Sequence, residues 1–413
     1  MFYVIIYIVV IQLIKSLFSF LNKKDSFLVV EILPNNVIRT ALVKLDSHNK
    51  EIIFEKSFNF FPENKTDSPN FHSLKKNLRK FGKLAHYKIS VGIDSQYAST
   101  VYSSVSLVRN NPKDLIDESD LDNLISQAVW KFFDRHRIRV AQKLGISDFD
   151  VLLTDVRIEH VRLDGHRVLN PVGFKARTIE IQLCETFTNR NIINELKTLL
   201  PASGIRLISE SGSAWSHFLA AGNQERRFAL ANISFDQTAM FLTEESRMGH
   251  HGGFEWGERN LLNSLVEALA LDTDTAKALL AMYMQKETSD SLAKRLDRIL
   301  MGELDSLAKS FNSLIGKSDV RLVYLHSSFS LPEIVFSQAF KNRIDFPVKL
   351  EALTHSFISD NHNFHLKFNK RVDPKIAFGI FVLVLEAVAE PHYEAMRQMS
   401  QIAKRRVRWL TPI

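Results

Sequence analysis

The chain of 413 residues contains a single cysteine, Cys184. One thiol cannot form a disulfide within the chain, and it cannot supply a cysteine zinc cluster. The sequence therefore excludes a disulfide framework and a zinc cluster of this kind. A chain with one thiol suits a cytoplasmic fold.

Several other chemical signatures are missing. Spacing alone assembles no Ser-His-Asp arrangement and no cysteine nucleophile. His250 and His251 have no further ligand at helical spacing, so we predict a plain loop there and no metal site. The basic runs lack interleaved aromatic residues except at the C-terminus, and we therefore expect no nucleic-acid partner. We see no low-complexity segment.

The remaining composition is that of a globular protein, with 45% hydrophobic and 24% charged residues. A chain of this length can form two or three domains with substantial cores. The net charge of +7 is spread along the chain without a dominant block. A mildly basic surface suits an anionic membrane or a nucleic acid and does not distinguish them.

The apolar run at the N-terminus, residues 1–14, is shorter than the roughly 20 residues that a full membrane span needs. Beyond it, one face of an amphipathic helix is indicated by the spacing of Ile14, Leu17, Phe18 and Leu21. Two lysines follow, which are typical of a cytoplasmic side. These features favour a membrane anchor or in-plane membrane helix over residues 1–24. A buried core helix and a mis-chosen start codon remain as alternatives.

The C-terminal segment, residues 396–413, is a basic tail in which Trp409 and Leu410 lie among lysines and arginines. Basic residues mixed with tryptophan and aliphatic residues can lie on anionic lipid. The alternative is a solvated tail without a partner.

Between the ends, strand and helix patterns alternate, which indicates an α/β protein. Residues 27–45 and 228–243 each show the pattern of a strand, a turn and a returning strand. Apolar spacing predicts a long helix over about 121–143, and a strongly apolar helix begins at Pro374.

Six stretches in a fixed order carry a resemblance to a known family. They are FLVVEILPNNVIRTALV, LDGHRVLNPVGFKARTIEIQL, ISESGSAWSHFLAA, GGFEWGERNLLNSLVEAL, LVYLHSSFSLPEI and VDPKIAFGIFVLVLEA. In this order the chain resembles the FtsA/PilM family, a bacterial branch of the actin-like ATPase superfamily, from about Lys23 to Ala389.

The resemblance implies an α/β fold of duplicated actin-like (ribonuclease-H-like) domains with an inserted strand-helix-strand-strand module. It places the first domain in residues 25–98, 188–226 and 373–395, and the inserted module in 99–187. The second domain is expected in 227–372, with a helical subdomain at about 258–318.

An actin-type nucleotide site needs glycine turns whose N–H groups close on phosphates, and carboxylates that hold Mg²⁺. The first loop reads Glu31-Ile32-Leu33-Pro34 where the family has Asp-x-Gly-Ser. The second reads Asn232-Ile233-Ser234-Phe235 for Asp-x-Gly-Gly, and the third reads Ser327-Ser328-Phe329 for three glycines. Proline has no N–H, and the other replacements put side chains where a phosphate would approach. All three loops have therefore lost their glycines.

The resemblance assigns the following positions to the former nucleotide site: Glu31, Asn35, Arg39, Asn232, Asp236, Thr238, Gly252, Gly253, Ser327 and Ser330. Among them, Gly252-Gly253 keeps its glycines, and we expect it to form a turn before the helix at about residue 258. We predict no catalytic residue and no bound cofactor, and we interpret the chain as a degenerate ATPase. The alternative is a working actin-like ATPase with divergent loops that binds ATP and Mg²⁺.

We therefore predict a membrane-associated, FtsA-like scaffold for a cell-division complex, at the cytoplasmic face of the cell membrane. Its partners would be the inner-membrane surface and a tubulin-like division protein, with self-association as a further possibility. The alternative is a PilM-like scaffold of a type IV pilus or secretion system, whose partner is an inner-membrane pilus protein. In both cases the resemblance implies that the inserted module binds the partner.

Overall fold

The computed structural model describes residues 25–34, 37–46, 50–60, 71–222, 227–244, 247–354, 357–358, 365–370, 372–388 and 398–405. The expected N-terminal membrane segment with Ile14, Leu17, Phe18 and Leu21 lies outside the described residues, as do Asn35, Trp409 and Leu410. Among the described residues, no helix combines the length and apolar character needed to cross a membrane.

The first sheet has the strand order β15-β3-β2-β1-β4-β9. Strands β1 (Asp25–Ile32), β2 (Ile38–Asp46) and β3 (Glu51–Phe60) are antiparallel neighbours. Strands β4 (Lys88–Ile93) and β9 (Ile205–Glu210) continue the sheet parallel to β1. The apolar run of β1 is buried on both faces, as expected for a central strand.

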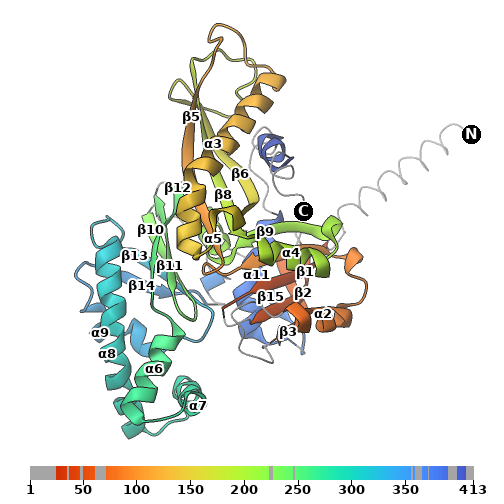
Figure 1. Cartoon of the computed structure of the whole chain (residues 1–413). Coiled ribbons are helices and arrows are strands. Elements are labelled where there is room, and N and C mark those ends of the chain that lie inside the picture. The colour runs from red at the N-terminus through yellow and green to blue at the C-terminus, as the bar shows by residue number, and fades with distance from the viewer. Residues whose placement is uncertain are drawn as a thin grey trace, which may run out of the picture.

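The second sheet repeats this arrangement in the order β12-β11-β10-β13-β14. Strands β10 (Arg227–Ile233), β11 (Thr238–Glu244) and β12 (Arg247–Phe254) are antiparallel, and β13 (Leu322–Ser327) and β14 (Lys349–Ala352) run parallel to β10. Each sheet thus contains a three-stranded meander extended by two parallel strands, and the first sheet has β15 as a sixth strand. The duplication expected from the sequence is present (Figure 1).

Two helices, α5 (Ser211–Gly222) and α11 (Pro374–Val388), contribute to a core that both sheets share. Trp215 and Phe381, one from each helix, contact each other at its centre. The opposite face of the first sheet is covered by α2 (Phe71–Leu78), α4 (Arg190–Leu199) and the short helices η1 (Arg79–Phe81) and η2 (Leu84–His86).

The opposite face of the second sheet is covered by α6 (Glu258–Leu269), α7 (Thr273–Met284) and α8 (Asp290–Ile315), with η5 (Glu333–Phe336) and α9 (Gln338–Lys341) beside them. The helix α8 buries leucines at the spacing of a single face, including Leu296, Leu300, Leu304 and Leu307.

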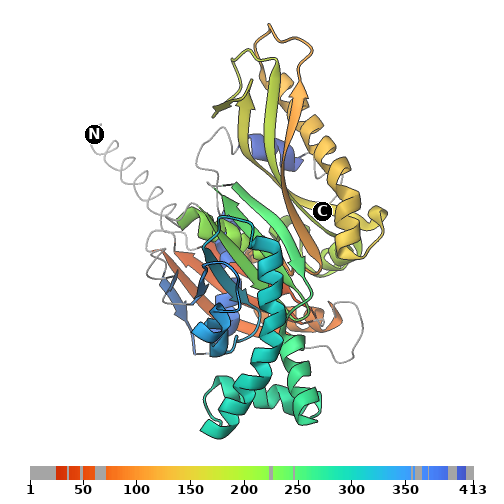
Figure 2. The same cartoon turned by 90° about the vertical axis from the view of Figure 1, so that its left-hand side faces the viewer.

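The inserted module contains β5 (Ala98–Val108), α3 (Glu118–Leu144), η3 (Asp148–Asp150), β6 (Val151–Leu163), β7 (His166–Val168) and β8 (Thr178–Asn189). Its sheet has the order β5-β8-β6-β7, and α3 packs against the sheet. Asp117 caps the start of α3, and Gly145 ends it with a left-handed φ of 64°. The module projects away from the two larger sheets (Figure 2).

Three details differ from the sequence-based expectation. Strand β15 (His365–Phe368), expected in the second domain, pairs in parallel with β3 of the first sheet. Residues 249–253, expected as a loop and a glycine turn, lie inside β12, because the chain returns antiparallel to β11 with a bulge. Residues 398–405 of the expected basic tail form a helix whose Met399 and Ala403 are buried in the core of the inserted module.

Candidate functional site

The two sheets bring polar side chains together where their central strands end. Glu31 lies near the end of β1, Asp94 follows β4, and Glu210 ends β9. Because parallel strands end at the same edge of a sheet, these carboxyl groups share one edge. Asn232 on β10 and His326 on β13 lie at the equivalent edge of the second sheet. We call Glu31, Arg39, Asp94, Asn232, Ser234 and His326 the central polar cluster.

Glu31 and Arg39 form the part of the central polar cluster that belongs to the first sheet. The Ser211 hydroxyl donates to Glu31 Oε1 at 2.8 Å, and Arg39 Nη1 lies 3.6 Å from Glu31 Oε2. Burial raises the pKa of Glu31, and the nearby Arg39 charge opposes that effect. Arg39 Nη2 also donates to the backbone carbonyl of Ser328 at 2.5 Å. One guanidinium therefore ties the first sheet to the third loop.

Asp94 is bound to the turn of the second hairpin. The Ser234 hydroxyl donates to Asp94 Oδ2 at 2.8 Å, and the backbone N–H of Gln96 donates to Asp94 Oδ1 at 2.9 Å. Burial raises the pKa of Asp94 to about 6, although both hydrogen bonds favour the charged form. The carboxyl group is thus held between the two sheets by protein donors.

Asn232 occupies the position where the family has its second metal-binding carboxylate. Its Oδ1 accepts a hydrogen bond of 2.6 Å from His326 Nδ1, and its Nδ2 lies 3.5 Å from Ser95 Oγ. Burial lowers the pKa of His326 to about 3, so the imidazole is neutral at physiological pH. Trp215 lies against the His326 ring at 4.5 Å. This part of the cluster carries no negative charge.

One backbone donor in each of the three loops bonds to the protein itself. The N–H of Leu33 donates within its own turn at 2.9 Å, and that of Ser234 does the same at 2.8 Å. The N–H of Ser328 donates at 3.0 Å to the carbonyl that ends β10. Pro34 has no N–H to offer. These donors are therefore already used by the fold.

The start of α6 is closed in the same way. The N–H groups of Glu258 and Arg259 donate to the carbonyls of Ser234 and Phe235 at 3.2 and 2.9 Å. A side chain at Gly257 would lie 2.4 Å from those same carbonyls, so glycine allows this close approach. Free N–H groups at a helix start can bind an anion, but here carbonyl groups of the second hairpin accept their hydrogen bonds.

The remaining sequence-predicted positions lie around the cluster or away from it. Asp236 pairs with Arg259 of α6 at 2.7 Å, and Thr238 donates to the backbone carbonyl of Trp256 at 2.8 Å. Ser327 accepts from the N–H of Phe329 at 3.2 Å, and Ser330 is exposed. The pair Gly252-Gly253 lies on the edge strand β12, two strands from β10.

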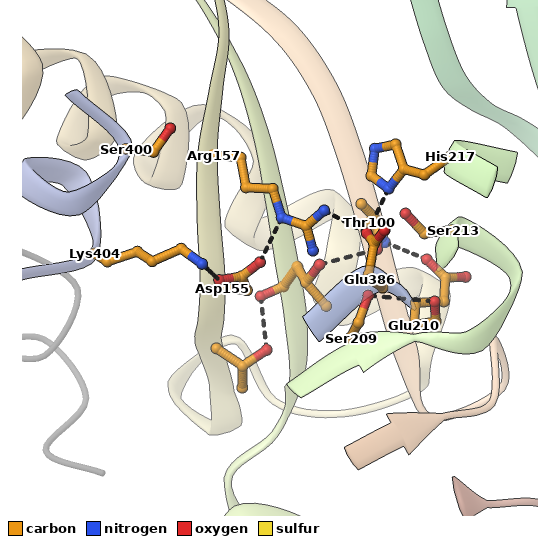
Figure 3. A network of polar contacts seen from close by, with 12 residues as sticks. Thr100, Asp155, Arg157, Ser209, Glu210, Ser213, His217, Glu386, Ser400 and Lys404 are labelled. Atoms are coloured by element: carbon orange, nitrogen blue, oxygen red, sulfur yellow. Dashed lines mark hydrogen bonds and ion pairs between the residues drawn. The ribbon is translucent and has the colours of Figure 1, made fainter. Parts of the chain in front are cut away.

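A second polar network joins the inserted module to the first domain (Figure 3). Arg157 of β6 forms a short ion pair with Glu386 of α11, which also accepts from His217 Nδ1 of α5 at 2.6 Å. Burial alone would raise the pKa of Glu386, but the Arg157 charge and the contact with His217 lower it to about 2. Asp155 contacts Arg157 at 2.9 Å and Lys404 of the C-terminal helix at 3.0 Å. The network thus connects four segments that are distant in sequence.

Glu159, Cys184 and His217 lie next to this network and are the residue types that bind metals. Their potential ligand atoms lie within 4.8 Å of one another. However, the Tyr102 hydroxyl contacts His217 Nε2 at 3.1 Å, which is the nitrogen that a metal would need. Burial also raises the pKa of Cys184 well above its usual range, which disfavours a thiolate ligand. The donor set therefore fits a hydrogen-bond network better than a metal ion.

Sequence reasoning did not single out Asp94, Glu210, Ser211 and His326. A usable signal existed for the two acids, because each stands directly after a buried apolar strand. Ser211 and His326 carried no such signal. A serine at a helix start and a histidine at the end of a strand are common in many structural roles.

Comparison with solved structures supports the fold. No family model and no curated protein sequence matches the chain. A chain of the PilM–PilN type IV pilus biogenesis complex is similar, with a TM-score of 0.55 and 12% identity, over 89% of this chain and 100% of that chain. With the duplicated sheets, this likeness confirms the actin-like fold.

Two further structures are more distant. One is a Bacteroides thetaiotaomicron protein with an actin-like ATPase fold and unknown function, with a TM-score of 0.36 and 12% identity over 80% of this chain and 91% of that one. The other is the ethanolamine utilization protein EutJ from Carboxydothermus hydrogenoformans, with a TM-score of 0.38 and 9% identity over 87% and 90%.

Proposed function

We propose that this chain is a protein-assembly scaffold that keeps an actin-like fold and does not turn over ATP. The observation that carries the proposal is the central polar cluster. Its Ser234 hydroxyl donates to the Asp94 carboxylate across the two sheets, and its Arg39 guanidinium donates to the backbone carbonyl of Ser328 in the third loop. An actin-type nucleotide would need the same space and the same donors.

The residues present do not fit a phosphate chain with Mg²⁺. Mg²⁺ prefers carboxylate and water oxygens, and the position of the second carboxylate is taken by Asn232, which is bonded to His326. One backbone N–H in each of the three loops, on Leu33, Ser234 and Ser328, is already bonded within the fold. ATP could enter only if several buried hydrogen bonds broke without replacement, which is energetically costly.

Calorimetric titration of the full chain with ATP and Mg²⁺, together with a phosphate-release assay, tests this proposal. We expect no release of phosphate and no saturable binding of ATP that depends on Arg39 of the central polar cluster. A matched variant, Asn232→Asp with Ser234→Gly and Phe235→Gly, restores the family residues of the second loop. It should bind ATP better than the unchanged chain if these residues are the obstacle. Release of phosphate, or micromolar binding by the unchanged chain that Arg39→Met abolishes, would overturn the proposal.

For the partner, we propose a cytoplasmic segment of an inner-membrane pilus protein, as in a PilM-like scaffold. The likeness to the PilM–PilN complex, which extends over all of the matched chain, supports this choice. An FtsA-like role with a tubulin-like division protein is the other candidate, supported by the sequence resemblance. Co-migration of the purified chain in gel filtration with one of these two proteins from the same genome would decide between them.

We also propose that the scaffold works at the cytoplasmic face of the cell membrane, held by residues 1–24. Sedimentation with vesicles of anionic and zwitterionic lipid tests this proposal. The full chain should pellet with anionic vesicles, and a chain beginning at residue 25 should stay in the supernatant. A Leu17→Asp and Leu21→Asp variant keeps the length but removes the apolar face. Equal pelleting of all three forms would exclude an N-terminal anchor.

A further inference from the structure

A cavity of about 530 Å³ lies between the inserted module and the second domain. One wall comes from β5 and the last two turns of α3, and the other comes from β12 and the turn residue Gln237. Binding sites for small molecules typically enclose roughly 300–1,000 Å³ and often lie between domains. We call this space the junction cavity. It shares no residue with the central polar cluster.

The wall formed by α3 is positively charged. His136, Arg139 and Lys143 line the cavity and lie at i, i+3 and i+7 on one face of the helix. His250 of β12 lines the cavity as well. Burial, and then the charges of Lys143 and Arg139, lower the pKa of His250 to about 3. The charges of both cations therefore reach the His250 ring. Glu255 is the one carboxylate among the lining residues.

The protein neutralises these cations incompletely. Lys143 Nζ donates to Ser99 Oγ at 3.1 Å and lies 4.0 Å from Glu210 Oε1. Arg139 forms no ion pair with any residue that the structure describes. Like charges four residues apart on a helix repel each other. An anion in the cavity would remove this repulsion and would pair with both side chains.

The other lining groups suit a ligand that also has a neutral part. The Nε2 atoms of His136 and His250 are buried and have no hydrogen-bond partner among the described residues. The aromatic side chains of Tyr102 and Phe254 supply apolar surface to the same cavity. The cavity therefore combines two cations, two neutral imidazoles and two aromatic rings.

We propose that the junction cavity binds a small phosphorylated molecule, with Arg139 and Lys143 as the charge partners of its phosphate. A phosphate monoester carries close to two negative charges at neutral pH and can balance both cations, whereas a single carboxylate balances one. The ligand would contact α3 and β12 together, and it would hold the inserted module against the second domain.

Calorimetric titrations of the full chain with inorganic pyrophosphate and with AMP test this proposal. The unchanged chain should bind at least one probe saturably below millimolar concentration. Arg139→Gln and Lys143→Met should each weaken that binding by about tenfold or more, because each removes a charge-assisted hydrogen bond. Stronger binding of AMP would identify a nucleotide-like ligand, and stronger binding of pyrophosphate a simpler phosphate compound.

Two control variants locate the binding. Lys131→Gln removes an exposed positive charge from the same helix and should leave the affinity unchanged. Arg39→Met alters the central polar cluster and should also leave it unchanged. The proposal is overturned if neither probe binds at millimolar concentration, or if the Arg139→Gln and Lys143→Met double variant binds normally. It is overturned as well if Arg39→Met abolishes binding, since the anion would then lie between the two sheets.

Discussion

The hydroxyl of Ser234 donates a hydrogen bond of 2.8 Å to Oδ2 of Asp94, and the bond joins the second sheet to the first. Ser234 lies in the second of the three loops that the sequence resemblance relates to a nucleotide site, and in this structure its hydroxyl is bonded to the protein itself. The same holds for the carbonyl of Ser328 in the third loop, which lies 2.5 Å from Arg39, 289 positions away in the chain. The second and third loops therefore contribute direct hydrogen bonds to the interface between the two sheets.

Replacing Asp94 with asparagine should change how stability depends on pH. The folded pKa of about 6 lies above the ordinary 3.8, so the contribution of this group to stability is complete below pH 3.8 and is lost as pH rises through 6. Asparagine can bond to Ser234 and Gln96 without a charge. Asp94→Asn should therefore be more stable than the unchanged chain above pH 6, by about 2–3 kcal/mol.

Urea unfolding at a series of pH values measures this difference. It should shrink toward zero as the pH falls to 3.8. The exposed Asp114→Asn serves as a control and should show a constant difference. If Asp94→Asn is less stable than the unchanged chain at neutral pH, the buried carboxylate stabilises the fold and our assignment of its role is wrong.

Removing Arg39 should destabilise the contact between the sheets. Arg39→Met leaves Glu31 buried, 2% exposed, with Ser211 but without its cationic neighbour. Loss of one partner from a buried ion pair typically costs about 3 kcal/mol or more. The free energy of unfolding in urea, or the melting temperature, should fall accordingly.

The double variant Glu31→Gln with Arg39→Met tests the cause. It removes both charges, so it should recover a large part of the stability lost in Arg39→Met. Equal losses in the single and double variants would mean that the bond to Ser328, and not the buried charge, accounts for the effect. No loss in Arg39→Met would show that the contact contributes nothing to stability.

Much of the fold could be predicted from the sequence, because it depends on local patterns. The two hairpins, the long helix α3 and the apolar helix α11 follow from apolar spacing and turn residues. The duplicated sheets and the inserted module were expected only because six ordered stretches resemble a family that has them. Strand β15 could not be placed, because a four-residue strand pairs equally well with either sheet until the tertiary structure brings it beside β3.

The candidate site could be predicted only as a set of positions. The resemblance implies that Leu33, Pro34 and Phe235 stand where related proteins have phosphate-binding residues, but it does not say what those loops contact instead. The bonds from Arg39 to Ser328 and from Ser234 to Asp94 join residues that are far apart in the chain. Such long-range pairs leave no periodic pattern in the local sequence. Polar residues at strand ends can bind a ligand or can bond to one another, and the sequence does not distinguish the two cases.

The C-terminal helix, residues 398–405, should stabilise the inserted module. Met399 is 1% exposed in the core of the module, and the Ser400 hydroxyl accepts a hydrogen bond of 3.1 Å from the N–H of Ile158. Met399→Asp would bury a charge in an apolar site, and removal of a buried methionine side chain alone typically costs about 2–5 kcal/mol. We expect the helix to detach.

Hydrogen exchange of backbone amides measures the detachment. Amides of β6, residues 151–163, should exchange faster in Met399→Asp, while those of α8 in the second domain should be unchanged. Arg405→Gln, at an exposed position of the same helix, is the matched control and should behave like the unchanged chain. Unchanged protection of β6 in Met399→Asp would show that the helix does not support the module.

Glu185 of β8 provides the last test, because it is a buried acid without a partner. It is 0% exposed, and neither carboxyl oxygen has a hydrogen-bond partner among the described residues. Burial raises its pKa well above the usual range, so its contribution to stability is present below the ordinary pKa of 4.5 and is lost as pH rises.

Glu185→Met should therefore increase the free energy of unfolding at neutral pH by about 1–3 kcal/mol. The gain should diminish below pH 4.5, whereas Glu180→Gln, a half-exposed position on the same strand that pairs with Arg162, should show no such gain. A loss of stability in Glu185→Met at neutral pH would mean that the buried carboxyl group is bonded in solution and supports the module.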